Sequence, residues 1–279
     1  MLVGHKEKQK IFEELFKNDV LSHGYIFFGE EQVSKKSFAL AFANFLEKGK
    51  FEMPSGVLSE AKLISPEGGS IGIDTARDAK HFLSQKPILS KRRVLIIDDA
   101  HKLTAQAQNA ILKISEEPPQ SSLIIVVTPT LDSLLPTLVS RLQRIYFSRI
   151  ETKAIATLLK DRGVESSEAE RLAKASLGRP GRAIDALENP EFKRFSLLVK
   201  GFIKNDSTRK DVLQSLIKEN DDVEEKDLID IFVSHIMAEL TLDPLRNIKA
   251  LSALCDRFTK MNDFTTNRRL QLETALWNL

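Results

Sequence analysis

The chain has 279 residues, of which 42% are hydrophobic and 29% charged, a composition typical of a folded globular protein with two or three domains. Its net charge is +2. Residues 1–150 contain 20 basic and 17 acidic residues (net +3), and residues 151–279 contain 21 basic and 22 acidic residues (net −1). Neither half therefore has the strong positive charge that is typical of a domain that binds nucleic acid by itself. No apolar run reaches the roughly 20 residues that span a bilayer, and the N-terminal residues show no secretory pattern, so we expect a cytoplasmic protein.

Five apolar runs in the first half of the chain predict buried strands. They are residues 25–28, 62–65, 94–98, 123–128 and 144–147. Runs that are continuously apolar, rather than alternating, are typical of a parallel sheet covered on both faces. Helical patterns separate the runs, so the sequence predicts a doubly wound α/β domain with a parallel five-stranded sheet.

Helix signals divide the chain further. Thr104 is a predicted N-cap, and Ser167 with Glu170 has the spacing of a capping box. After about residue 150 the strand signal ends, and from about 191 every pattern is helical, with apolar faces that include Ile231, Phe232 and Phe258. We therefore predict three domains, at residues 1–150, 151–190 and 191–279.

The stretch "GEEQVSKKS" follows the first predicted strand, where a phosphate-binding loop is expected. The pattern G-x-x-x-x-G-K-[ST] is damaged: Gly29 and Lys35 keep their places, but Ser34 replaces the second glycine and Lys36 the hydroxyl residue. Lys36 cannot ligate Mg²⁺, and Ser37 stands about 100° further around the helix. A plain loop with solvated lysines and a residual phosphate site both remain open.

Two further motifs carry charge at strand or helix ends. Asp98 and Asp99 end the strand "VLIID", where one carboxylate could hold Mg²⁺ and the other orient water, although Asp99 could equally cap a helix or fix a loop. Arg141, in "SRLQRI", lies near the end of a predicted helix, next to the last predicted strand. It could be a solvated surface charge or a finger offered to a neighbouring subunit's triphosphate.

Histidine and cysteine predict no metal site. The five histidines show no ligand spacing, and the single cysteine, Cys255, allows neither a disulfide within the chain nor a cysteine zinc cluster. We expect Cys255 to lie in the core on an apolar helix face.

Taken together, three stretches resemble the bacterial clamp-loader subunits of the AAA+ superfamily. They are "SHGYIFFGEEQVSKKSFALAFANFL", "GGSIGIDTARDAKHFLSQKPILSKRRVLIIDDAHKLTAQAQNAILKISEEPP" and "LIIVVTPTLDSLLPTLVSRLQRIYF". The resemblance covers residues 1–190. It implies a P-loop-type AAA+ core, then a small helical lid domain and an all-helical collar domain.

The resemblance also implies roles for single residues. Gly29, Lys35 and Ser37 fall on or beside the Walker A loop, Asp98 and Asp99 on Walker B, and Thr128 on sensor 1. Ser140 and Arg141 match the family's Ser-Arg-Cys motif, whose arginine acts on the adjacent subunit's ATP. Gly181 takes the place of the sensor 2 arginine, and the usual four zinc-binding cysteines are missing.

This combination predicts a subunit that has kept the finger and lost the nucleotide loop. Such a chain requires no cofactor of its own; ATP and Mg²⁺ would be bound by partner motor subunits. The resemblance implies a hetero-oligomer with the motor and clamp-opening subunits, acting on the sliding clamp and primer–template DNA. The alternatives are an active ATPase motor subunit of the same assembly and a DNA-binding adaptor unrelated to ATP.

Overall fold

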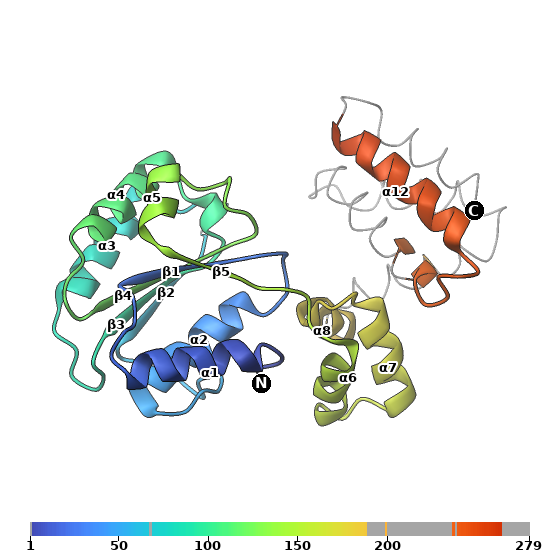
Figure 1. Ribbon diagram of the computed structural model, residues 1–279, viewed down its shortest axis with the longest axis horizontal. Helices are drawn as coiled ribbons and strands as arrows, with labels where there is room; N and C mark the ends of the chain where they lie inside the picture. Colours follow the sequence, from blue (N-terminus) through green and yellow to red (C-terminus); the bar gives the residue numbers. More distant parts are fainter. Residues whose placement is uncertain (1, 67–68, 189–198, 200–235, 238, 264–279) are drawn as a thin grey trace. The chain divides into compact units, whose positions relative to one another are not determined.

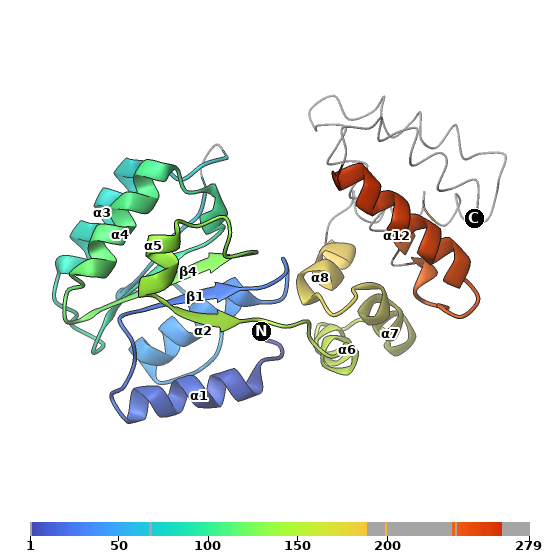
Figure 2. The ribbon, with the colours of Figure 1, turned by 45° about the horizontal axis from the view of Figure 1, so that its top comes forward.

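The computed structural model describes residues 2–66, 69–188, 199, 236–237 and 239–263. The chain divides into two compact units (Figures 1 and 2). The first comprises residues 1–154 together with the short segment 179–181, and the second comprises residues 155–178 and 182–279.

A parallel five-stranded sheet forms the centre of the first unit, as the sequence predicts. Its strands are β1 (Gly24–Phe28), β2 (Ala61–Ile64), β3 (Arg93–Ile97), β4 (Ser122–Thr128) and β5 (Gln143–Tyr146), in the order β2-β3-β4-β1-β5. Every neighbouring pair is parallel. All five carboxyl ends therefore lie at one edge, and residues that follow different strands are brought together there.

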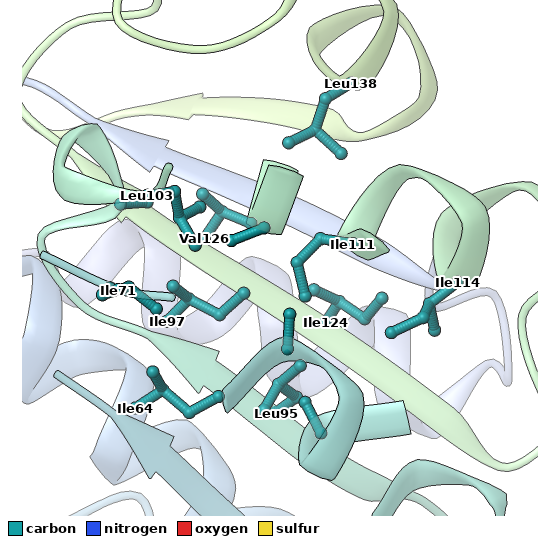
Figure 3. Close-up of a cluster of buried hydrophobic side chains, with 14 of the residues drawn as sticks. Ile64, Ile71, Leu95, Ile97, Leu103, Ile111, Ile114, Ile124, Val126 and Leu138 are labelled. Carbon is teal, nitrogen blue, oxygen red and sulfur yellow. The ribbon is translucent and has the colours of Figure 1, made fainter. Parts of the chain in front are cut away.

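Three helices cover one face of this sheet: α3 (Ile73–Ser84), α4 (Ala105–Glu116) and α5 (Pro136–Arg141). Alternate strand residues such as Leu95, Ile97, Ile124 and Val126 pack there against Ile111 (Figure 3). Burying each such side chain contributes about 1.5–3 kcal/mol.

The other face is covered by α1 (Lys6–Lys17) and α2 (Lys35–Lys48). Here the intervening strand residues, such as Phe27 and Ile96, meet an aromatic cluster in which Phe12, Phe38 and Phe147 take part. Because both faces of the central strands β1, β3 and β4 are buried, these strands are apolar almost throughout, which explains why the sequence shows runs instead of alternation. The edge strands β2 and β5 are more exposed.

The second unit is helical in its described part, with α6 (Thr152–Asp161), α7 (Ser166–Ala175), α8 (Pro180–Glu188) and α12 (Ile248–Asp263), of which α6 and α8 begin in the first unit. An ion pair between Lys160 and Glu170 (3.0 Å) connects α6 with α7. Ile231 and Phe232 lie outside the described residues, as does the side chain of Phe258. In the described part, the structure contains no helix with the length and hydropathy of a membrane span.

The structure confirms one helix cap and corrects two other expectations. Thr104 caps α4, its hydroxyl accepting a hydrogen bond from the Ala107 amide at 3.2 Å. The predicted capping box is wrong, because Glu165 caps α7 and accepts from the amides of Ser167 and Glu168. Hydrogen bonds from Ser167, the side-chain bond first, hold the pKa of Glu165 below its usual value.

Cys255 provides the second correction. It lies on α12, and its side chain is exposed instead of buried in the core.

Candidate functional site

The loop between β1 and α2 turns through three residues with positive φ. Gly29 has φ 134°, and a Cβ there would lie 2.3 Å from the carbonyl oxygen of Phe147, so this position requires glycine. Gln32 (φ 62°) and Ser34 (φ 70°) adopt the left-handed conformation. Ser34 thus makes the turn that a second glycine would make, despite its side chain.

Lys35 bends back onto this loop. Its Nζ donates to the carbonyl oxygens of Gly29 and of Glu30, the latter at 2.5 Å, and the side chain is buried. Burial is the main reason why the pKa of Lys35 is lowered; the carboxylates of Glu31, Asp98, Asp99 and Glu30 act in the opposite direction. The lysine that would neutralise a phosphate is therefore bonded to the loop itself.

Lys36 binds the first carboxylate of "IDDAH". Its Nζ lies 2.9 Å from Asp98 Oδ2, and the aspartate side chain is only 13% exposed. The sequence predicts that Lys36 cannot ligate Mg²⁺, but it gives no sign of this pairing. The first turn of α2 and the carboxyl end of β3 are thus joined through an ion pair.

Asp99 and Thr128 contact residues that lie close to them in the sequence. Asp99 has φ 48° and precedes the short helix η1 (Ala100–Lys102), and its carboxylate lies 3.9 Å from Lys102 Nζ. Its side chain makes no capping bond to that helix, so the capping alternative is not what the structure shows. Thr128, fully buried at the end of β4, donates to the Thr130 carbonyl at 2.9 Å and lies 3.0 Å from the Ser133 hydroxyl.

Arg141 ends α5 with an exposed guanidinium. Its Nη1 donates to the Thr137 carbonyl at 2.9 Å, and its Nη2 lies 2.7 Å from Glu116 Oε1 at the end of α4. Ser140 donates to the same Thr137 carbonyl at 2.9 Å. The arginine is thus held on the surface by groups at the ends of two helices, and both it and Glu116 are accessible from solvent.

The structure does not bring all the predicted site residues together in direct contact. The Gly29 loop, Lys35, Lys36 and Asp98 are connected by the contacts above, whereas Ser140 and Arg141 bond to α4 and α5 instead. Ser37 lies half-buried in the first turn of α2.

Gly181 lies directly against the loop, in the segment that groups with the first unit. Its amide donates to the Gln32 carbonyl at 3.1 Å, and a Cβ on Gly181 would lie 2.8 Å from Gln32 Cβ. An arginine at this position would therefore have to displace Gln32. The neighbouring Arg182 is buried.

Comparison with known proteins identifies the family to which this chain belongs. The family model described as "DNA polymerase III, delta subunit" matches residues 4–151, more than half of the chain. The chain belongs to this family. The match covers the parallel sheet and every predicted site residue from Gly29 to Arg141.

Relatives of this DNA polymerase III family member include two kinds of subunit. The delta-prime subunit of Bacillus subtilis is 29% identical over 195 residues, covering 66% of this chain and 59% of the relative. The gamma/tau subunit of Mycobacterium tuberculosis is 31% identical over 153 residues, covering 50% and 26%. The chain thus matches less than two thirds of the length of either relative.

Two solved structures share the fold of this chain. A DNA polymerase III gamma subunit-related protein from Thermotoga maritima superposes with a TM-score of 0.60 at 24% identity, over 95% of this chain and 97% of that protein. The RuvB Holliday junction branch migration motor of the same organism gives 0.50 at 17% identity, over 88% and 78%.

Three partners of the site were missed from the sequence. Glu116 pairs with Arg141, Asp98 with Lys36, and His5 Nε2 donates to the Val33 carbonyl of the loop at 2.9 Å. Burial is the main cause of the lowered pKa of His5. The sequence gives no signal for these three pairings, because each joins residues that are distant along the chain.

Proposed function

We propose that this chain is a delta-prime-like subunit of the DNA polymerase III clamp loader that does not hydrolyse ATP itself. One contrast carries the proposal. Lys35 and Lys36 are bonded to the loop and to Asp98, while Arg141 is exposed at the end of α5. A motor subunit needs an open phosphate loop, whereas a partner that completes a neighbour's site needs only the arginine.

In this role, Arg141 would stabilise negative charge that develops on the γ-phosphate of ATP bound to an adjacent motor subunit. The Thr137 carbonyl, which accepts hydrogen bonds from Ser140 and Arg141, would hold the end of α5 in its conformation. The remaining site residues would form a degenerate nucleotide site that does not catalyse hydrolysis. They are Gly29, Lys35, Ser37, Asp98, Asp99 and Thr128. The chain would then need no cofactor of its own.

The rest of the chain would serve assembly. We assign α6, α7 and α8 to a lid domain and the region from about residue 191 to a collar that would pack with equivalent domains of motor and delta subunits. The sliding clamp and primer–template DNA would be reached through this complex in the cytoplasm. The match to the Bacillus delta-prime subunit supports the assignment.

The second candidate is a gamma/tau-like motor subunit, which the similarity to gamma/tau relatives favours. ATP turnover by the purified chain, measured with Mg²⁺ and primed DNA, separates the two. We expect no turnover by the chain alone and a rise in DNA-stimulated turnover when it is added to motor and delta subunits. Appreciable turnover by the chain alone would establish the motor and contradict our proposal.

A further inference from the structure

The Lys36–Asp98 ion pair lies where a working phosphate loop would bring a metal ion. Lys36 occupies the hydroxyl position of the G-x-x-x-x-G-K-[ST] pattern, and its Nζ is 2.9 Å from Asp98 Oδ2. In a working loop, the hydroxyl at this position ligates Mg²⁺, and the carboxylate after the neighbouring strand helps to hold it.

The groups present do not suit Mg²⁺. This ion requires oxygen ligands at about 2.0–2.1 Å in near-octahedral geometry. An ammonium group has three donors and no acceptor, so Lys36 cannot be a ligand. Its positive charge, already placed on the carboxylate that the metal would use, also repels a divalent cation.

The carboxylate itself requires a positive partner. Asp98 is only 13% exposed, and a largely desolvated carboxylate without a partner raises the free energy of the folded state. In a working site that charge is balanced only while metal and nucleotide are bound. Here the ammonium of Lys36, a residue of the same chain, lies 2.9 Å from that carboxylate.

We infer that Lys36 supplies from within the chain the positive charge that Mg²⁺ supplies in a working phosphate loop, so that the loop is complete without metal and excludes divalent cations. The inference deepens the proposed function and rests on its premise of a non-catalytic loop.

Binding of Mn²⁺, a paramagnetic substitute for Mg²⁺, tests the inference on the full chain. Electron paramagnetic resonance titrations with and without ADP would compare the wild type, Lys36→Thr and Lys36→Thr/Asp98→Asn. We expect Lys36→Thr to bind Mn²⁺ at least about ten-fold more tightly than the wild type, a difference of about 1.4 kcal/mol. The double variant should lose this gain.

A matched control is Lys48→Thr, which makes the same change at an exposed lysine at the other end of α2 and should leave Mn²⁺ binding at the wild-type level. Wild-type binding of Mn²⁺ that Asp98→Asn abolishes would overturn the inference. So would a Lys36→Thr variant with no gain, because Lys36 would then not be what excludes the metal.

Thermal unfolding provides an independent readout that needs no metal. Lys36→Met should lower Tm by about 2–4 °C, since it leaves Asp98 unpaired, and adding Asp98→Asn should recover part of the loss. Strictly additive shifts would show that the pair does not form. ATP turnover by the isolated wild-type chain would contradict the proposed function as well as the inference. Mn²⁺ binding by the wild type at Asp98, without ATP turnover, would contradict the inference alone.

Discussion

At the scale of single residues, the loop keeps its shape while its chemistry changes. Ser34 adopts φ 70°, so the left-handed turn survives the loss of glycine. Lys36, where a hydroxyl is expected, contacts Asp98 instead of a metal. The damage read from the sequence is therefore a replacement of ligand-binding groups by internal contacts, and the backbone path is retained.

Ser34→Gly should stabilise the protein, because a residue with a Cβ in the left-handed conformation costs about 1–2 kcal/mol and glycine avoids this cost. Glycine also loses more backbone entropy on folding, and this loss cancels only part of the gain. We expect the free energy of unfolding in urea to rise by about 0.5–1 kcal/mol. The matched control, Ser37→Gly, makes the same change inside α2 and should lower it by a similar amount. Destabilisation by Ser34→Gly would show that the serine side chain holds the loop.

At the scale of elements, a buried glutamate fixes the edge of the sheet. Glu60, directly before β2, accepts hydrogen bonds from the amides of Ile88 (2.7 Å) and Leu89 (3.1 Å). Its other oxygen lies 3.2 Å from Arg93 Nε at the start of β3. One carboxylate therefore joins the edge strand, its neighbour and the segment that connects α3 to β3.

Glu60→Gln should lower the free energy of unfolding by about 3 kcal/mol, because it leaves the largely buried Arg93 without a counter-charge. Urea denaturation measures this effect. The control, Asp74→Asn, breaks an ion pair with Arg77 in which both side chains are largely exposed and should change stability by no more than about 0.5 kcal/mol. Equal effects of the two changes would contradict the structural role of Glu60.

At the scale of the whole molecule, the α/β core could be predicted from the sequence because its three central strands, β1, β3 and β4, are buried on both faces. Their apolar runs coincide with the observed strands within one residue at each end. The capping box at Ser167 and the burial of Cys255 were mispredicted, since both depend on local competition between polar groups and on packing that spacing does not encode.

For the candidate site too, part could be predicted from the sequence and part could not. Gly29, Lys35, Asp98 and Thr128 could be placed at one sheet edge, because parallel strands bring their carboxyl ends together. Their partners could not, because the Lys36–Asp98 and Arg141–Glu116 contacts join segments that are distant in sequence. Which group an ammonium or guanidinium selects depends on three-dimensional proximity.

The central claim, that Arg141 acts on a neighbour's ATP, is tested most directly by Arg141→Ala in a clamp loader reconstituted with motor and delta subunits. The variant should fold and assemble, because the exposed pair with Glu116 contributes no more than about 1 kcal/mol. Hydrolysis at the adjacent site should fall on the order of 10³-fold, as for fingers in related phosphoryl transfer. Arg144→Ala, at an exposed arginine of β5, should leave turnover unchanged. Normal ATP hydrolysis and clamp loading by the Arg141→Ala complex would contradict the account.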